Sequence, residues 1–222
     1  MCVVASVGVE GALHDIESLL AGMETTIEEA VASESGAEAG RVAAAIREAA
    51  EKKGDTLGEA EVARGVDFVV RYVRAVPPLL REAQATSKGT FAEAKMDRMV
   101  QAAAAYWSAD DDVIHDDEGL FGILDDAYCT VSLLLALSAR FEAEAGQRLV
   151  AADLAGPTDM VRQLLGPSNA GRLDAYVVEA LSDASVGELL ASLAEHAVPT
   201  PPSQTRFTTD DDALILELFG VL

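Results

Sequence analysis

The segment from Tyr106 to Asp126 has the densest run of side chains that could do chemistry. It reads Tyr-Trp-Ser-Ala-Asp-Asp-Asp-Val-Ile-His-Asp-Asp-Glu-Gly-Leu-Phe-Gly-Ile-Leu-Asp-Asp. Carboxylate oxygens are the ligands that Mg²⁺, Ca²⁺ and Mn²⁺ prefer, and an imidazole can join a transition-metal site. The candidate metal ligands in this segment are Asp112, Asp116, Asp125 and Asp126, with His115 as a further candidate.

Two interpretations of these acids stay open. In the first, Asp112 and Asp116 cap helices and solvate a loop, while Asp125 and Asp126 accept hydrogen bonds from backbone donors. In the second, they hold a divalent ion for a hydrolase. Their spacing matches neither an EF-hand loop nor a Glu-x-x-His helix pair, and acidic clusters arise by chance in so acidic a chain. We therefore favour the structural interpretation, without a cofactor, and keep the Mg, Ca or Mn enzyme as the alternative.

The same segment resembles the signature of the YkvA-like family, domain of unknown function 1232. In that family a tyrosine leads into Ser-Pro-Ile-Asp-Leu-Ile-Pro-Asp, and an apolar stretch then ends in Gly-Tyr-Leu-Asp-Asp. Without gaps, the matching positions are Tyr106, Asp112, Ile114, Asp116, Gly122, Leu124, Asp125 and Asp126. Asp110, His115 and Gly119 stand where prolines are usual. The resemblance is confined to this segment and implies a helix-loop-helix motif without an established activity.

Charge limits the partners of the chain. Its 38 acidic and 16 basic residues give a net charge of −22, which repels nucleic acid and anionic lipid. Lysine occurs only at Lys52, Lys53, Lys88 and Lys95, so the surface resembles that of proteins adapted to a salt-rich cytoplasm, although an ordinary acidic protein fits equally well. The two cysteines form no metal or redox motif, which favours a reduced, cytoplasmic setting.

No segment is expected to enter or cross a membrane. The first residues lack the basic region and the apolar stretch of a signal peptide. The longest uncharged apolar stretch within a helix, residues 127–139, is shorter than the roughly 20 residues that span a bilayer. It is therefore predicted to be a buried core helix.

Helical periodicity dominates the rest of the sequence. Apolar residues recur three and four positions apart, which predicts an all-α, irregular multi-helix bundle around a central apolar helix at about 118–145, without a significant sheet. That helix would place Glu118, Gly122, Asp125 and Asp126 near one face. Breaks are expected at Gly54, before the pair Pro77-Pro78, and at Gly146, Gly156 and Gly166.

Three helix starts carry the spacing of a capping box, in which a hydroxyl and a carboxylate each satisfy one free backbone donor. The pairs are Thr56 with Glu59, Thr90 with Glu93, and Ser185 with Glu188. Each pair precedes a stretch with helical periodicity, so we expect helices to begin at these positions.

The predicted domain organisation has three parts. Residues 1–198 form a helical domain that contains the acidic motif at 106–126, residues 199–210 form a proline-rich linker, and residues 211–222 form a docking helix. So short an apolar helix is unstable alone in water and must dock on its own domain or on another chain. The sequence therefore favours a cytoplasmic interaction or structural module, with a protein partner or a second copy bound through 211–222. No residue is predicted to be catalytic, because neither His14 nor His196 has a nucleophile arranged beside it.

Overall fold

Helices account for almost all of the regular structure. The computed structural model describes residues 15–33, 40–107, 113–114, 116–195, 217 and 219, with the backbone alone at 116–118. Its elements are α1 (Ile16–Ser33), α2 (Arg41–Lys53), α3 (Glu59–Arg74), α4 (Val76–Ser87), α5 (Glu93–Tyr106), the 3₁₀ helix η1 (Asp116–Phe121), α6 (Leu124–Ala145), α7 (Ala155–Leu181) and α8 (Ala184–Ala194). These ranges contain no strand, and the predicted all-α bundle is confirmed.

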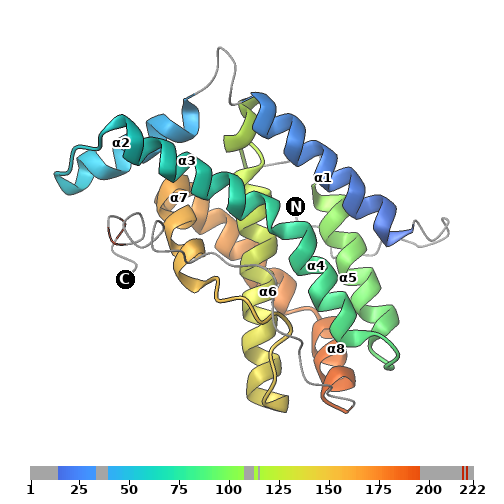
Figure 1. Cartoon of the computed structure of the whole chain (residues 1–222). Helices are drawn as coiled ribbons and strands as arrows, with labels where there is room; N and C mark the ends of the chain where they lie inside the picture. The colour runs from blue at the N-terminus through green and yellow to red at the C-terminus, as the bar shows by residue number, and fades with distance from the viewer. Residues whose placement is uncertain are drawn as a thin grey trace.

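Helix α6 forms the centre of the bundle (Figure 1). It packs along α7 and also contacts α3, α4, α8 and η1. Its first eight residues, Leu124 to Val131, are all buried, and apolar side chains of the later turns continue the core. Within the described residues, only the segment from Gly119 to Ala145 is long and apolar enough to cross a membrane. Of its apolar 18-residue stretch, 78% is buried inside the protein. The predicted core helix is confirmed.

Glycine and proline end helices where the sequence predicted at Gly54, at Gly146 and before Pro77. The break expected at Gly156 is wrong, because this residue lies in the first turn of α7 (Ala155–Leu181). Gly54 follows α2 with a φ of 87°, and Gly146 follows α6 with a φ of 69°. This left-handed conformation costs glycine little because it has no Cβ. Pro77 and Pro78 lie in the first turn of α4, where their missing N–H groups break no helical bond, and α3 ends just before them at Arg74.

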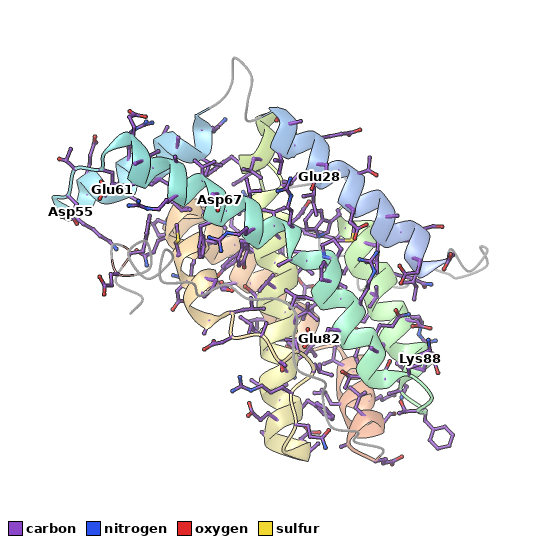
Figure 2. All side chains as sticks on the ribbon, viewed as in Figure 1. Glu28, Asp55, Glu61, Asp67, Glu82 and Lys88 are labelled. Atoms are coloured by element: carbon purple, nitrogen blue, oxygen red, sulfur yellow. The ribbon has the colours of Figure 1, made fainter. Side chains whose placement is uncertain are left out.

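The three predicted capping boxes are wrong in detail. Helix α3 begins after Gly58, whose N–H donates to Glu61 at 2.7 Å (Figure 2 labels Glu61), and not at Thr56. Helix α8 is capped by Asp183, whose carboxylate accepts from the Ser185 N–H at 2.7 Å. An aspartate before a helix competes directly with a following serine for the same free donors, and here it lies at the cap position.

The third predicted box, Thr90 with Glu93, is also displaced. Thr90 Oγ1 accepts from the Ala92 N–H at 3.1 Å, while the Glu93 carboxylate accepts from Gly89 N–H at 2.9 Å. Neither residue bonds in the reciprocal pattern of a capping box, because Ala92 occupies the cap position of α5. The two side chains order the α4–α5 turn instead.

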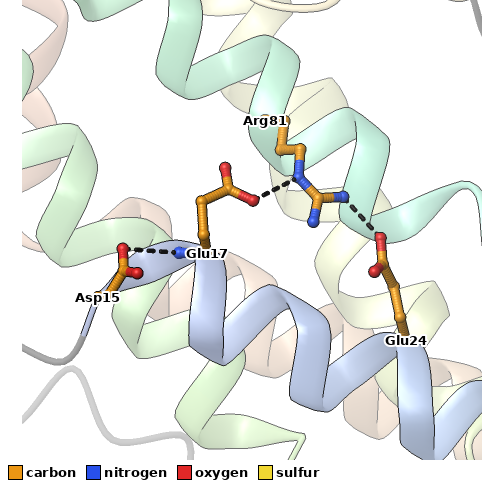
Figure 3. Close-up of polar contacts among 4 residues, drawn as sticks. All are labelled: Asp15, Glu17, Glu24 and Arg81. Atoms are coloured by element: carbon orange, nitrogen blue, oxygen red, sulfur yellow. Dashed lines mark hydrogen bonds and ion pairs between the residues drawn. The ribbon is translucent and has the colours of Figure 1, made fainter.

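Arginines join helix α1 to α3 and α4. Arg81 of α4 donates to Glu17 at 3.1 Å and to Glu24 at 2.6 Å, both on α1 (Figure 3). Arg74, the last residue of α3, donates twice to Glu28, at 2.7 and 2.6 Å. These pairs are largely exposed and add little energy, so the burial of Leu20, Met23 and Ile27 holds α1 in place.

The connection from α6 to α7 is buried at Leu149, Val150, Ala152 and Leu154, and side chains satisfy part of its backbone. The Leu149 N–H donates to Ser138 Oγ at 3.0 Å, and the Leu149 carbonyl accepts from Thr86 Oγ1 at 3.2 Å. The N–H of Ala151 donates to Glu82 of α4, which Figure 2 labels. A buried backbone without such partners would be costly, so these three side chains are what allow the loop to lie in the core.

Candidate functional site

The acidic motif places two carboxylates inside the protein. Asp125 and Asp126 lie in the first turn of α6, 0% and 1% exposed. Asp125 Oδ2 accepts from the Ile114 N–H at 3.0 Å, and Asp125 Oδ1 accepts from the Asp126 N–H at 3.1 Å. The helix N-terminus also favours negative charge at these positions. Asp125 thus ties the segment before η1 to the start of the central helix.

The side chains of the other candidate ligands lie outside the described part of the chain. Asp112 and His115 lie outside the described residues, and Asp116 begins η1 with only its backbone described. Among the side chains that the structure describes, no group of three or more His, Cys, Asp or Glu is placed to hold a metal ion.

The predicted common face of Glu118, Gly122, Asp125 and Asp126 is wrong. Helix α6 begins at Leu124, so Glu118 lies in η1 and Gly122 in the turn between the two helices. The cause is Gly119, whose φ of 62° and ψ of −132° interrupt the helical path. The predicted central helix at about 118–145 is accordingly η1, a turn, and α6.

The η1 segment is clamped between α1 and α2. A Cβ atom on Gly119 would lie 2.6 Å from Ser33 Oγ at the end of α1, so only glycine fits this approach. On the other side, the Arg41 guanidinium at the start of α2 lies 5.5 Å from the centroid of the Phe121 ring, within cation–π range. The described residues Gly119 and Phe121 of the motif are thus used in packing.

Polar side chains near the motif also join helices. Trp107, at the end of α5, donates from Nε1 to Thr130 of α6 at 3.1 Å. Tyr72 of α3 and Thr158 of α7 share a buried hydrogen bond of 3.2 Å. Burial raises the pKa of Tyr72, which keeps its hydroxyl neutral. Each of these aromatic residues contributes apolar area to the core while its polar atom has a partner.

A second polar group lies between α6 and α7. The Tyr128 hydroxyl donates to Asp174 Oδ1 at 2.6 Å, and Arg162 donates to Asp174 Oδ2 at 2.8 Å. Burial, followed by the neighbouring carboxylate, raises the pKa of Tyr128 to about 12. Burial alone would raise the pKa of Asp174, but the bonds from Tyr128 and Arg162 outweigh it and hold this pKa below its ordinary value. The group joins helices and presents no nucleophile.

A third group of polar contacts surrounds Phe219. The Phe219 side chain is 2% exposed and belongs to the main hydrophobic core. Gln163 of α7 donates to the Phe219 carbonyl at 2.8 Å, and Lys53 at the end of α2 lies 5.2 Å from the centroid of its ring. Lys53 also donates to the Gln163 side chain at 2.9 Å. We name Lys53, Gln163 and Phe219 the Phe219 site.

The sequence predicts a docking segment at 211–222 but not Lys53 and Gln163, which contact Phe219. The adjacent Lys52 and Lys53, half of all lysines in the chain, are the sequence feature that could have indicated α2 as part of this site. Gln163 carries no such signal, because a single glutamine on a helix matches no motif. Apart from Glu217 and Phe219, residues 196–222 lie outside the described residues, and so does the predicted linker at 199–210.

Comparison with known proteins adds no relative to this description. No family model, no curated protein and no solved structure matches the chain. Function therefore has to be argued from the residues themselves.

Proposed function

We propose that the protein is a cytoplasmic helical interaction module whose C-terminal segment docks between α2 and α7. The order α5, η1, α6 supports the helix-loop-helix that the YkvA-like resemblance implies. Asp125, Trp107, Tyr72 and Tyr128 each bond within the fold, which supports a structural use of the residues best suited to chemistry.

The observation that carries this proposal is the burial of Phe219. An aromatic residue far along the chain from α7 enters the main core and is bonded through its carbonyl as well as its ring. Full burial of a phenylalanine side chain contributes about 1.5–3 kcal/mol, enough to hold a short segment that would not fold alone. The surface that accepts Phe219 is thus suited to binding a peptide segment.

Deletion from Asp210 onward tests the proposal. We expect the truncated chain to lose thermal stability and to change its mass in solution or its bound partners, because the apolar surface under Phe219 becomes exposed. Chemical denaturation and light scattering measure both effects. A truncated protein with native stability, mass and partners would contradict the docking role.

A matched pair of substitutions sharpens this test. Phe219→Ala should lower the free energy of unfolding by about 3 kcal/mol, because the ring is buried and its loss leaves a cavity. Phe91→Ala removes the same side chain from a position that is 77% exposed and should change stability little. Equal effects of the two substitutions would show that Phe219 is not an anchor.

The adjacent buried carboxylates of Asp125 and Asp126 favour one alternative, a divalent-metal-dependent hydrolase that uses the acids from Asp112 to Asp126. Calorimetric titration with Ca²⁺, Mg²⁺ and Mn²⁺ separates the two proposals, because a metal site gives saturable heat that Asp125→Ala and Asp126→Ala abolish. Absence of saturable heat, together with loss of folding in both variants, favours the structural role.

A further inference from the structure

The Phe219 site combines three separate means of recognition. Its apolar part buries one aromatic ring in the core between α2 and α7. Its polar part is the side-chain amide of Gln163, which donates to a main-chain carbonyl. Its charged part is Lys53, which lies over the ring and donates to Gln163. The bond from Lys53 to Gln163 Oε1 orients the amide so that its NH₂ group points to the carbonyl of Phe219.

The conformation of the docked residues explains the choice of donors. Glu217 is helical and Phe219 lies in a turn. A main-chain carbonyl in a turn has no partner in a helical ladder and needs another donor. The Gln163 amide supplies it for the Phe219 carbonyl, while the Lys53 ammonium lies over the ring. The site therefore reads a main-chain carbonyl as well as the aromatic side chain of the same residue.

The position of Lys53 is unusual in so acidic a chain. Lysine is scarce in a protein of net charge −22, and the neighbouring Lys52 is paired with Glu48 at 2.8 Å. Lys53 instead lies against the docked aromatic ring. The segment that carries Phe219 is acidic at Asp210, Asp211, Asp212 and Glu217. Its attraction to a cation fits this charge pattern.

We propose that the Phe219 site is a receptor for an aromatic side chain together with the main-chain carbonyl of the same residue, and that the chain's own C-terminal segment occupies it in cis. This inference rests on the proposed interaction role. Tethering gives the cis segment an effective concentration of about millimolar, so a second segment of the same chemistry binds only where the cis segment is weakened. The C-terminal segment then acts as an internal competitor that controls access to the site.

The experiment uses the full-length chain and a fluorescent synthetic peptide of residues 210–222. Anisotropy titration should show binding to the Phe219→Ala chain at least tenfold tighter than to the unaltered chain, because the substitution weakens the internal competitor. A peptide that carries Phe219→Ala should bind at least tenfold more weakly than the unaltered peptide. If circular dichroism shows that Phe219→Ala disturbs folding, the variant Phe219→Leu is used in its place, because leucine keeps an apolar side chain in the core.

Substitutions in the receptor identify the site. Within the Phe219→Ala chain, Gln163→Met removes the amide donor at similar volume and should weaken peptide binding about threefold to tenfold, the usual effect of one hydrogen bond. Lys53→Met should weaken it about twofold to fivefold, whereas the adjacent control Lys52→Met should leave it unchanged.

Three outcomes overturn the proposal: equal binding by the unaltered and Phe219→Ala chains, equal binding of the two peptides, or insensitivity to Gln163→Met. These outcomes leave the docking role itself intact if deletion from Asp210 still lowers stability. Failure of that deletion test would remove both proposals together.

Discussion

The Arg162 guanidinium and the Asp174 carboxylate form an ion pair of 2.8 Å across the kink of α7. Gly166, between them, has a φ of 77° and a ψ of 161°, and Pro167 follows it. The hydroxyl of Tyr128 on α6 bonds to the same carboxylate at 2.6 Å. The Asp174 side chain thus joins the two halves of α7 to each other and to the central helix α6.

Removing the charge of Asp174 should loosen this junction. Asp174→Asn is expected to lower the free energy of unfolding by about 1 kcal/mol at neutral pH, since bonds to a charged acceptor contribute more than neutral ones but partial exposure screens them. Urea denaturation measures the change. The control Asp159→Asn, on an exposed position of α7, should have little effect.

The pH dependence of that effect has a definite sign. Because the pKa of folded Asp174 is lowered, its contribution is present above the unfolded pKa of about 3.9 and is lost as the pH falls through the lower folded value. The stability difference between the unaltered protein and Asp174→Asn should therefore shrink on acidification below about pH 4. A difference that stays constant to lower pH would contradict this assignment.

Tyr128 should ionise at a higher pH than an ordinary tyrosine. With a pKa of about 12, its hydroxyl stays neutral after an ordinary tyrosine has ionised near pH 10. A raised pKa means that its contribution to stability is present below about pH 10 and is lost as the pH rises through about 12. The ultraviolet absorbance of tyrosinate follows the step, which Tyr128→Phe should reduce in amplitude.

Asp125 should tolerate an isosteric change far better than a truncation. Asp125→Asn keeps an acceptor oxygen for the Ile114 N–H, whereas Asp125→Ala leaves that buried donor without its partner, at a cost of about 1–3 kcal/mol. Thermal denaturation ranks the two variants. Equal loss in both would show that the charge, and not the hydrogen bond, is what the site requires.

Gly119 should accept no side chain while Ser33 is present. Gly119→Ala is expected to cost about 2 kcal/mol, from the strained backbone and from contact with Ser33 Oγ. Ser33→Gly in the same chain should restore only part of this loss, because it removes the contact and leaves the backbone strain. Full restoration, or none, would show that only one of the two causes acts.

High salt should stabilise the protein. At a net charge of −22, molar KCl screens repulsion among carboxylates, so the melting temperature should rise between low and molar KCl. Differential scanning calorimetry across KCl concentrations checks this. An unchanged melting temperature would remove the idea that the surface is adapted to salt.

The sequence by itself determined the helices and many of their ends. Apolar spacing is a local property, so it identified α2, α3 and the buried α6 without knowledge of their neighbours. Gly54 and Gly146 ended helices as predicted, because glycine takes the left-handed conformation at little cost wherever it occurs. For the acidic motif, residue type alone suggested that Asp125 would accept backbone hydrogen bonds, as it does.

Tertiary structure alone decided which helices meet and which residues face one another. Tyr128 and Asp174, or Lys53 and Phe219, are far apart in the chain, and their pairing depends on how each helix is rotated and crossed against its neighbours. The close approach of Gly119 to Ser33 likewise joins two separate elements, so no pattern within residues 106–126 could predict it. Periodicity specifies the buried face of a helix, whereas packing selects the partner of that face.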